Sequence, residues 1–221
     1  RMCLGTWGGG VRMIDERAGR IKSLTTAHGL GNDRISSLAF DEKGSAWIGT
    51  YGTGVDVFDT KAQTIKHLRT AQGLNNDIVL SVFADKQHQI WIGTEGGEAN
   101  VYNTASGNIH HLSSRNGLNN GSAFYFGFAQ DSQARTWVGS FGGGVDVLDE
   151  NTGTLKNITS TNGLLYPDIT FLLTDSRGRI WVNSSRRAPH LSAVEVIDEE
   201  KRSIKSFKSN KGLSILNGGG I

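Results

Sequence analysis

The sequence has little of several features that would direct the chain to other classes of protein. Its 221 residues include two prolines and one cysteine, Cys3, so no internal disulfide can form. No apolar run approaches the ~18 residues that mark a membrane-spanning helix. Basic and acidic residues number 23 and 21, a net charge of +2, without the clustered positive charge that nucleic acids and anionic membranes attract. We therefore expect no nucleic-acid partner and no membrane contact by this segment.

The near absence of cysteine also bears on the compartment. A chain with one cysteine fits the cytosol or a disulfide-free periplasmic protein. The chain opens on Arg1-Met2-Cys3 without the charged, apolar and small-residue regions of a signal peptide. We expect an excised piece of a longer protein or a processed product.

Glycine, in contrast, is abundant, with 30 residues against 37% hydrophobic residues. So much glycine indicates many tight turns or close backbone contacts. Because the glycines follow no three-residue period, a collagen helix is excluded. The composition therefore favours a globular chain made of short elements joined by turns.

A repeat of about 44 residues runs through the chain, and such a period indicates a repeat architecture. Segments of Trp, an apolar residue and Gly begin at Trp47, Trp91 and Trp137, with a looser copy at Trp181. Counting back 44 residues from Trp47 leads to Cys3, which fills a Trp position. Gly-Leu pairs recur at spacings of 44, 44, 46 and 49, at Gly29-Leu30, Gly73-Leu74, Gly117-Leu118, Gly163-Leu164 and Gly212-Leu213.

Each repeat predicts four short strands, which we call A to D. In one copy these are 35–40, 46–50, 55–58 and 65–68. The sequence Val55-Asp56-Val57-Phe58 alternates apolar and polar residues, as a half-buried strand does. The segments 41–44 and 59–61 have turn composition. No segment shows a helical apolar period over ten residues or more, which leaves an all-β chain.

Four strands in a period near 44, with a recurring Trp and Gly, predict the blades of a β-propeller. We expect one domain over 1–221, with repeats at about 1–30, 31–74, 75–118, 119–164 and 165–213, and 214–221 starting a further blade. A β-solenoid is the rival fold, but its coils are usually shorter. The glycine after each Trp lets a neighbouring backbone approach closely. The side chains expected to be buried between blades are Trp47, Trp91, Trp137 and Trp181.

The repeat resembles the two-component regulator propeller repeat over nearly the whole chain. The residues that carry the resemblance are Ile35, Leu38, Asp41, Gly44, Trp47-Ile48-Gly49-Thr50, Gly52, Gly54-Val55 and Phe58-Asp59. The resemblance implies a sensor domain in bacterial signal transduction, located in the periplasm, and many such sensors respond to polysaccharide breakdown products. The sequence departs from the pattern at three positions: Cys3 replaces Trp, His88 takes a turn-Gly position, and Asn183 takes a Gly position.

The sequence is compatible with two arrangements of the blades. In a five-bladed ring, 217–221 supplies strand A to the N-terminal strands, although three consecutive glycines make a poor strand. In the alternative, which we favour, the chain is part of a larger propeller. An open array leaves unpaired edges and predicts self-association.

The loops between strands B and C, together with the D–A loops, form the face where sequence varies most, as a recognition surface on a constant scaffold would. One B–C position reads Trp7, Tyr51, Glu95, Phe141 and Ser185 in the successive copies. Its aromatic rings can stack on sugar rings or simply cap the blades. The D–A loops carry Asn and Asp side chains, as in 32–33 and 75–77, which bind hydroxyls or cap turns. The longer fifth B–C loop adds Arg186, Arg187 and His190, and paired arginines suit a carboxylate or sulfate.

The sequence favours a ligand-binding role, with an oligosaccharide or acidic sugar as the expected ligand. It contains no nucleophile–base motif and no zinc motif, so we expect no catalysis, no cofactor and no metal. Two other functions are possible. A propeller lyase resembling the streptogramin lyases would need Glu95 and His190 to converge on a metal. The other is a protein-interaction scaffold, since propeller faces often bind peptides.

Overall fold

The computed structural model describes residues 2–96, 99–119, 125–186, 191–198, 201 and 203–208. Among these residues it contains nineteen β-strands and three single-turn 3₁₀ helices, so the all-β prediction is confirmed. The chain divides into two compact units, Arg1–His111 and Leu112–Ile221. Residues 214–221, which were expected to begin a further blade, lie outside the described residues.

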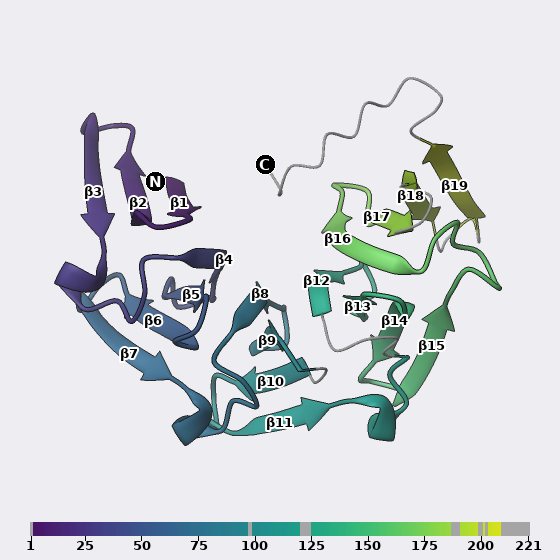
Figure 1. Cartoon of the computed structure of the whole chain (residues 1–221), viewed down its shortest axis with the longest axis horizontal. Coiled ribbons are helices and arrows are strands. Elements are labelled where there is room, and N and C mark those ends of the chain that lie inside the picture. Colours follow the sequence, from purple (N-terminus) through teal and green to yellow (C-terminus); the bar gives the residue numbers. More distant parts are fainter. Residues whose placement is uncertain are drawn as a thin grey trace. The chain divides into compact units, whose positions relative to one another are not determined.

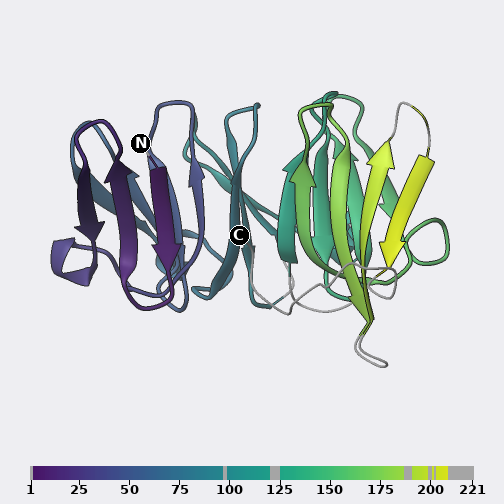
Figure 2. The same ribbon diagram turned by 90° about the horizontal axis from the view of Figure 1, so that it is seen from above.

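Unit 1 contains three antiparallel sheets in which consecutive strands pair, labelled in Figure 1. Each sheet is one blade, and among the described residues the first blade consists of strands B, C and D. The purple strands of this blade run up and down side by side in Figure 2. The strands are β1 (Met2–Thr6), β2 (Gly10–Asp15) and β3 (Arg20–Leu24); β4 (Ile35–Phe40), β5 (Ala46–Thr50), β6 (Val55–Asp59) and β7 (Thr64–Leu68); β8 (Val79–Ala84), β9 (Gln89–Thr94), β10 (Ala99–Asn103) and β11 (Ile109–Leu112).

Unit 2 contains two further four-stranded blades of the same order. Blade 4 consists of β12 (Tyr125–Gln130), β13 (Thr136–Ser140), β14 (Gly144–Asp149) and β15 (Thr154–Ile158). Blade 5 consists of β16 (Asp168–Thr174), β17 (Ile180–Arg186), β18 (Leu191–Asp198) and β19 (Ser203–Lys208). Within each unit the first strands of consecutive blades pack together, β4 against β8 and β12 against β16. The blade boundaries therefore follow the period of the sequence.

The turn between strands A and B needs a left-handed residue at one position. Gly44 has φ of 82° and Gly178 has φ of 73° there. His88 and Ala134 occupy the same position in blades 3 and 4 with φ of 63° and 61°. Side chains are disfavoured in this conformation, so two of the four turns are held in place against a local preference. Replacement of the turn glycine by His88 thus adds strain to the turn of blade 3 and leaves the shape of that turn unchanged.

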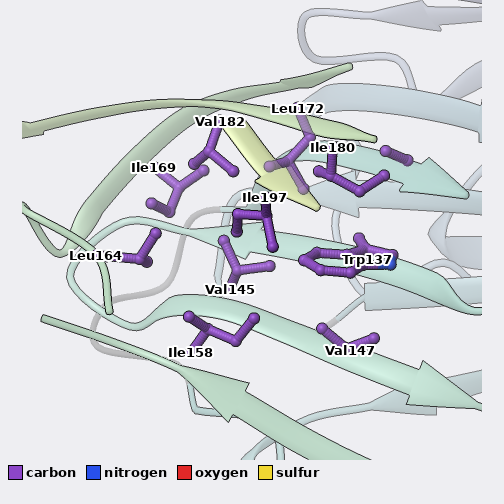
Figure 3. Close-up of a cluster of buried hydrophobic side chains, with 11 residues drawn as sticks. Trp137, Val145, Val147, Ile158, Leu164, Ile169, Leu172, Ile180, Val182 and Ile197 are labelled. Carbon is purple, nitrogen blue, oxygen red and sulfur yellow. The ribbon is translucent and has the colours of Figure 1, made fainter. Parts of the chain in front are cut away.

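Trp47 and Trp137 are each wedged between two blades of the same unit. Trp47, Trp91 and Trp137 are 4%, 0% and 0% exposed. In unit 2, Trp137 lies beside Ile180 and Ile197 of blade 5 within one apolar cluster (Figure 3). The expectation of full burial is wrong for Trp181, which is only half-buried. Its face of blade 5 is the one that also exposes Phe171 and Leu173.

In blades 2 and 4 the glycine two residues after the Trp is required by packing between blades. A Cβ on Gly49 would lie 2.8 Å from Cγ1 of Val79, the first residue of the next blade. The corresponding Cβ on Gly139 would lie 2.5 Å from Cγ2 of Ile169. Real Cβ atoms do not approach other carbons so closely, because dispersion turns into repulsion well before that distance. The close partner is a β-branched side chain, whereas we expected a neighbouring backbone.

In blades 2 to 5 the polar residue in the middle of strand C is buried, which corrects the expectation of a half-buried strand, whereas its counterpart Arg12 in blade 1 is half-buried. Asp56 is 0% exposed, and so are its counterparts Asn100 and Glu195, while Asp146 is 1% exposed. Neighbouring blades cover both faces of a blade in a stacked array. The alternation of apolar and polar residues in strand C therefore separates buried apolar contacts from buried hydrogen bonds. Buried polar groups need hydrogen-bond partners. Each of these side chains accepts the backbone N–H that follows a Gly-Leu pair, from Gly31, Asn75, Asn119 and Leu165 respectively.

Candidate functional site

The variable B–C position directly follows strand B in the first four blades. Trp7 follows β1, Tyr51 follows β5, Glu95 follows β9 and Phe141 follows β13. In blade 5 strand β17 is longer and includes Ser185. The strands therefore place these side chains at the same end of each blade, where the loops vary.

In unit 1 the structure brings two of the aromatic side chains into contact. The ring centroids of Trp7 and Tyr51 are 5.1 Å apart, with the planes inclined by 60°. Trp7 is 64% exposed and Tyr51 is 38% exposed. The guanidinium carbon of Arg34 lies 5.7 Å from the centre of the Trp7 ring, a favourable distance for a cation–π contact. Sequence reasoning missed Arg34, because its loop was read for carboxamides and carboxylates.

Backbone hydrogen bonds fix this aromatic pair. The carbonyl of Asp33 accepts the N–H groups of Gly8 and Gly10 at 3.0 and 2.9 Å. Tyr51 donates its N–H to the carbonyl of Arg34 at 3.0 Å. The segment 33–34 thus joins the B–C loop of blade 1 to that of blade 2. Because the links are made by backbone atoms, the side chains of Trp7 and Tyr51 stay available at the surface.

Gly10 must be a glycine for this link to form. Its φ is 69°, and a Cβ there would lie 2.3 Å from the carbonyl oxygen of Leu24. Gly54 repeats the arrangement with φ of 71° and 2.3 Å to the carbonyl of Leu68. The second glycine of each Gly-x-Gly is therefore required by its positive φ and by the close backbone of strand D in its own blade.

The polar side chains of the first D–A loop hold turns. Asp33 accepts the N–H of Thr26 at 2.7 Å and its hydroxyl at 3.0 Å. Asn32 donates to the carbonyl of Tyr51 and accepts the N–H of Arg34. Asp77 repeats the Asp33 contacts with Thr70. Of the two roles considered for these residues, the structure supports turn capping.

The other predicted site residues divide between the two units. Glu95 is half-buried in blade 3 and donates its N–H to the carbonyl of Ile78. In unit 2, Phe141 is half-buried, and Arg186 is exposed at the end of β17. Arg187 and His190 lie outside the described residues. The structure therefore assembles Trp7, Tyr51 and Arg34 in one place and leaves the grouping of the remaining residues untested.

Burial changes the ionisation of two of the strand C carboxyls. Burial raises the pKa of Asp146 to about 6, although hydrogen bonds from Asn157 and from the N–H of Asn119 oppose the rise. Burial likewise raises the pKa of Glu195, against hydrogen bonds from Ser184 and the N–H of Leu165. Shifted carboxyls often mark active sites, but here each one holds a loop of its own blade. We assign them a structural role.

Metal and membrane features are absent from the described residues. No three His, Cys, Asp or Glu side chains among them gather closely enough to hold a metal ion. No helix within the described ranges has the length and apolar composition to cross a bilayer.

Comparison with known proteins identifies the repeat. Residues 29–52 and 73–96 match the family described as "Two component regulator propeller". These segments each run from a Gly-Leu pair through strands A and B to the B–C loop. No curated protein matches the chain.

Solved structures share the propeller fold. The extracellular domain of the hybrid two component system BT3049 from B. thetaiotaomicron aligns with 96% of this chain at 24% identity and a TM-score of 0.75. The extracellular domain of BT4673 from the same organism aligns with 93% at 20% identity and 0.72. The β-propeller domain of Cps50 (Swd1) from Myceliophteria thermophila aligns with 97% at 13% identity and 0.65. The chain spans 27%, 29% and 69% of these structures respectively.

Proposed function

We propose that this chain, two segments of which match the two-component regulator propeller family, is the ligand-binding part of a bacterial signalling receptor and acts outside the cytoplasm. Two of the similar structures are extracellular domains of such systems, and this supports the proposed role and location. We further propose that the chain binds without catalysing a reaction. The support is that no three His, Cys, Asp or Glu side chains among the described residues gather to hold a metal ion.

The observation that carries the proposal is the exposed pair of Trp7 and Tyr51. Soluble proteins seldom leave a tryptophan 64% exposed when its ring offers so much apolar area for burial. Here the ring is also held in place by Tyr51 and Arg34. A fixed aromatic surface beside a cation is suited to a polar ring with an acidic group, because the ring stacks and the acid pairs. We propose a carbohydrate ligand, and an acidic sugar in particular.

A glycan array probed with the labelled chain, followed by calorimetry on each sugar bound, tests this proposal. We expect Trp7→Ala to weaken binding at least tenfold and Arg34→Gln to weaken acidic sugars more than neutral ones. Ile21→Ala is the matched control, because Ile21 is 68% exposed on β3 and its loss removes a comparable surface side chain. Failure of every glycan to bind, or equal binding by Trp7→Ala, would show that the ligand or the surface is wrong.

A further inference from the structure

A large cavity lies between blades 1 and 2, beside Cys3. Its volume is about 570 Å³, within the range of small-molecule sites. The junction between blades 2 and 3 holds a cavity of about 100 Å³ at the corresponding turns, and the junction between blades 4 and 5 one of about 130 Å³. The first junction is therefore unlike the other two.

The small side chain of Cys3 is one physical reason for the difference. Strand pairing places Cys3 beside Met13 and Met13 beside Lys22. In blade 2 the same row contains Trp47, Val57 and Lys66. Both rows have an apolar residue in the middle and a lysine at the end, but the indole ring is missing from blade 1. Burial raises the pKa of the Cys3 thiol, so the thiol is neutral at pH 7 and forms part of an apolar wall.

The opposite wall presents aromatic rings to the vacant space. In the second junction Trp47 packs on Tyr102, with ring centroids 5.0 Å apart. The counterpart of Tyr102 in blade 2 is Phe58, which lines the cavity with Phe40. Phe40 stands where blade 3 has Ala84, and it remains 47% exposed. The cavity thus offers aromatic partners to a ring that the chain itself does not supply.

The rim of the cavity is positively charged. Arg20 and Lys22 of β3 both line it. Lys22 donates to Oε1 of Gln63 at 2.6 Å, and among the described residues neither cation forms an ion pair. One acid, Asp15, lines the cavity, and its carboxylate accepts the N–H of Ala18. Two cations against one acid favour an anionic occupant.

We propose that this cavity binds a small aromatic anion, whose flat ring takes the place of the missing indole between blades 1 and 2 and whose carboxylate or sulfonate pairs with Arg20 and Lys22. The cavity is lined by the A–B and C–D turns, at the other end of the strands from Trp7 and Tyr51. The proposal is thus independent of the carbohydrate surface, and either site can fail without the other.

Binding of indole-3-acetate, measured by calorimetry and by the shift in thermal unfolding midpoint, tests the proposal, since a ligand of the folded state raises that midpoint. Cys3→Trp restores the residue of the other blades and fills the cavity, so we expect it to weaken binding at least tenfold. Cys3→Ser keeps the cavity open and is the matched control, with affinity expected within threefold of the unaltered chain. Undiminished binding by a folded Cys3→Trp variant would overturn the proposal.

The charge requirement is tested with 3-methylindole, which has the ring without the acid. Lys22→Met is expected to weaken indole-3-acetate at least threefold and to change 3-methylindole less than twofold. Equal affinity of the two compounds for the unaltered chain would contradict the role of the cationic rim. If Cys3→Trp does not fold, Phe40→Ser provides the second variant, because it removes an aromatic wall from a half-exposed position. Unchanged binding of both compounds by Phe40→Ser would also reject the site.

Discussion

The indole nitrogen of Trp137 donates a hydrogen bond of 2.9 Å to Oδ2 of Asp131, six residues earlier in the chain. The same bond joins Trp91 to Asp85 at 2.8 Å, and it recurs in blades 2 and 5. The aspartate also accepts backbone N–H groups of its own A–B turn. One side chain therefore fixes both the turn and the orientation of the ring that separates two blades.

The two blades of unit 2 bury this tryptophan to different extents, so its removal should lower the free energy of unfolding by different amounts. Trp137→Ala removes a fully buried side chain, and we expect it to lower the free energy of unfolding by about 3–5 kcal/mol. Trp181→Ala removes a half-buried ring and should cost less than half as much. Chemical denaturation of both variants measures the difference. Equal losses would mean that Trp181 is as fully packed as Trp137.

The left-handed turn of blade 4 predicts a stabilising substitution. Ala134 has φ of 61°, and a residue with a side chain pays about 1–2 kcal/mol for this conformation. We expect Ala134→Gly to raise the free energy of unfolding by about 1 kcal/mol, measured from the urea midpoint. Gly178→Ala is the reverse control at the same position of blade 5. Its Cβ would lie 2.8 Å from Cβ of Ser132, so it should destabilise the chain.

The packing glycine of blade 4 predicts coupling between two residues. Gly139→Ala places a methyl group against Ile169 and should cost about 1–3 kcal/mol by overpacking. Ile169→Ala removes the opposing side chain. We expect the double variant to be more stable than the sum of the single losses implies, by at least about 1 kcal/mol. Strict additivity in a double-mutant cycle would show that the two residues do not meet.

The buried carboxyl of Asp146 predicts a pH dependence of stability. Its folded-state pKa of about 6 lies above the ordinary 3.8, so the folded chain holds this proton more tightly than the unfolded chain. Stability from this group is complete below pH 4 and is lost as the pH rises through 6, by roughly 3 kcal/mol. In Asp146→Asn this loss is absent.

The measurement is the difference in unfolding free energy between Asp146→Asn and the unaltered chain at several pH values. The stability of the variant relative to the unaltered chain should increase between pH 4 and pH 7 and then stay constant. Glu195 is present in both proteins, so its own titration cancels. Asn100 already occupies this position in blade 3 with its hydrogen bonds satisfied, which shows that an amide fits the site. A constant difference across the range would argue against the raised pKa.

The fold could be predicted because the same sequence pattern recurs about every 44 residues. Trp47, Trp91 and Trp137 recur with the same neighbours, and each copy reinforces the assignment of four strands. The strand C pattern was harder to interpret. A polar residue between two apolar ones looks the same whether it faces solvent or, as Asp56 does, a buried loop amide. A signal was present, because the position occupied by Asp56, Asn100, Asp146 and Glu195 is polar in each of these copies.

The candidate site could be predicted only in part. Aromatic residues at one loop position indicated Trp7 and Tyr51, since the repeat aligns them. The contribution of Arg34 depends on how the D–A loop folds over the preceding blade, and no spacing rule predicts that distance. The cavity beside Cys3 was likewise hidden. The sequence showed the missing tryptophan, but the size of the space depends on whether Phe40 turns in to fill it, and it stays half-exposed.

The amide links at the B–C loops have an evolutionary consequence. Gly8 and Gly10 bind the carbonyl of residue 33, Gly52 and Gly54 bind that of residue 77, and Gly144 binds that of Pro167. Since the acceptors are carbonyls, the adhesion of one blade to the next is indifferent to which side chain the acceptor residue bears. The side chains of Trp7 and Tyr51 can therefore change without breaking these backbone links. Copying a blade duplicates its adhesive joint and supplies a new surface position that is free to diverge.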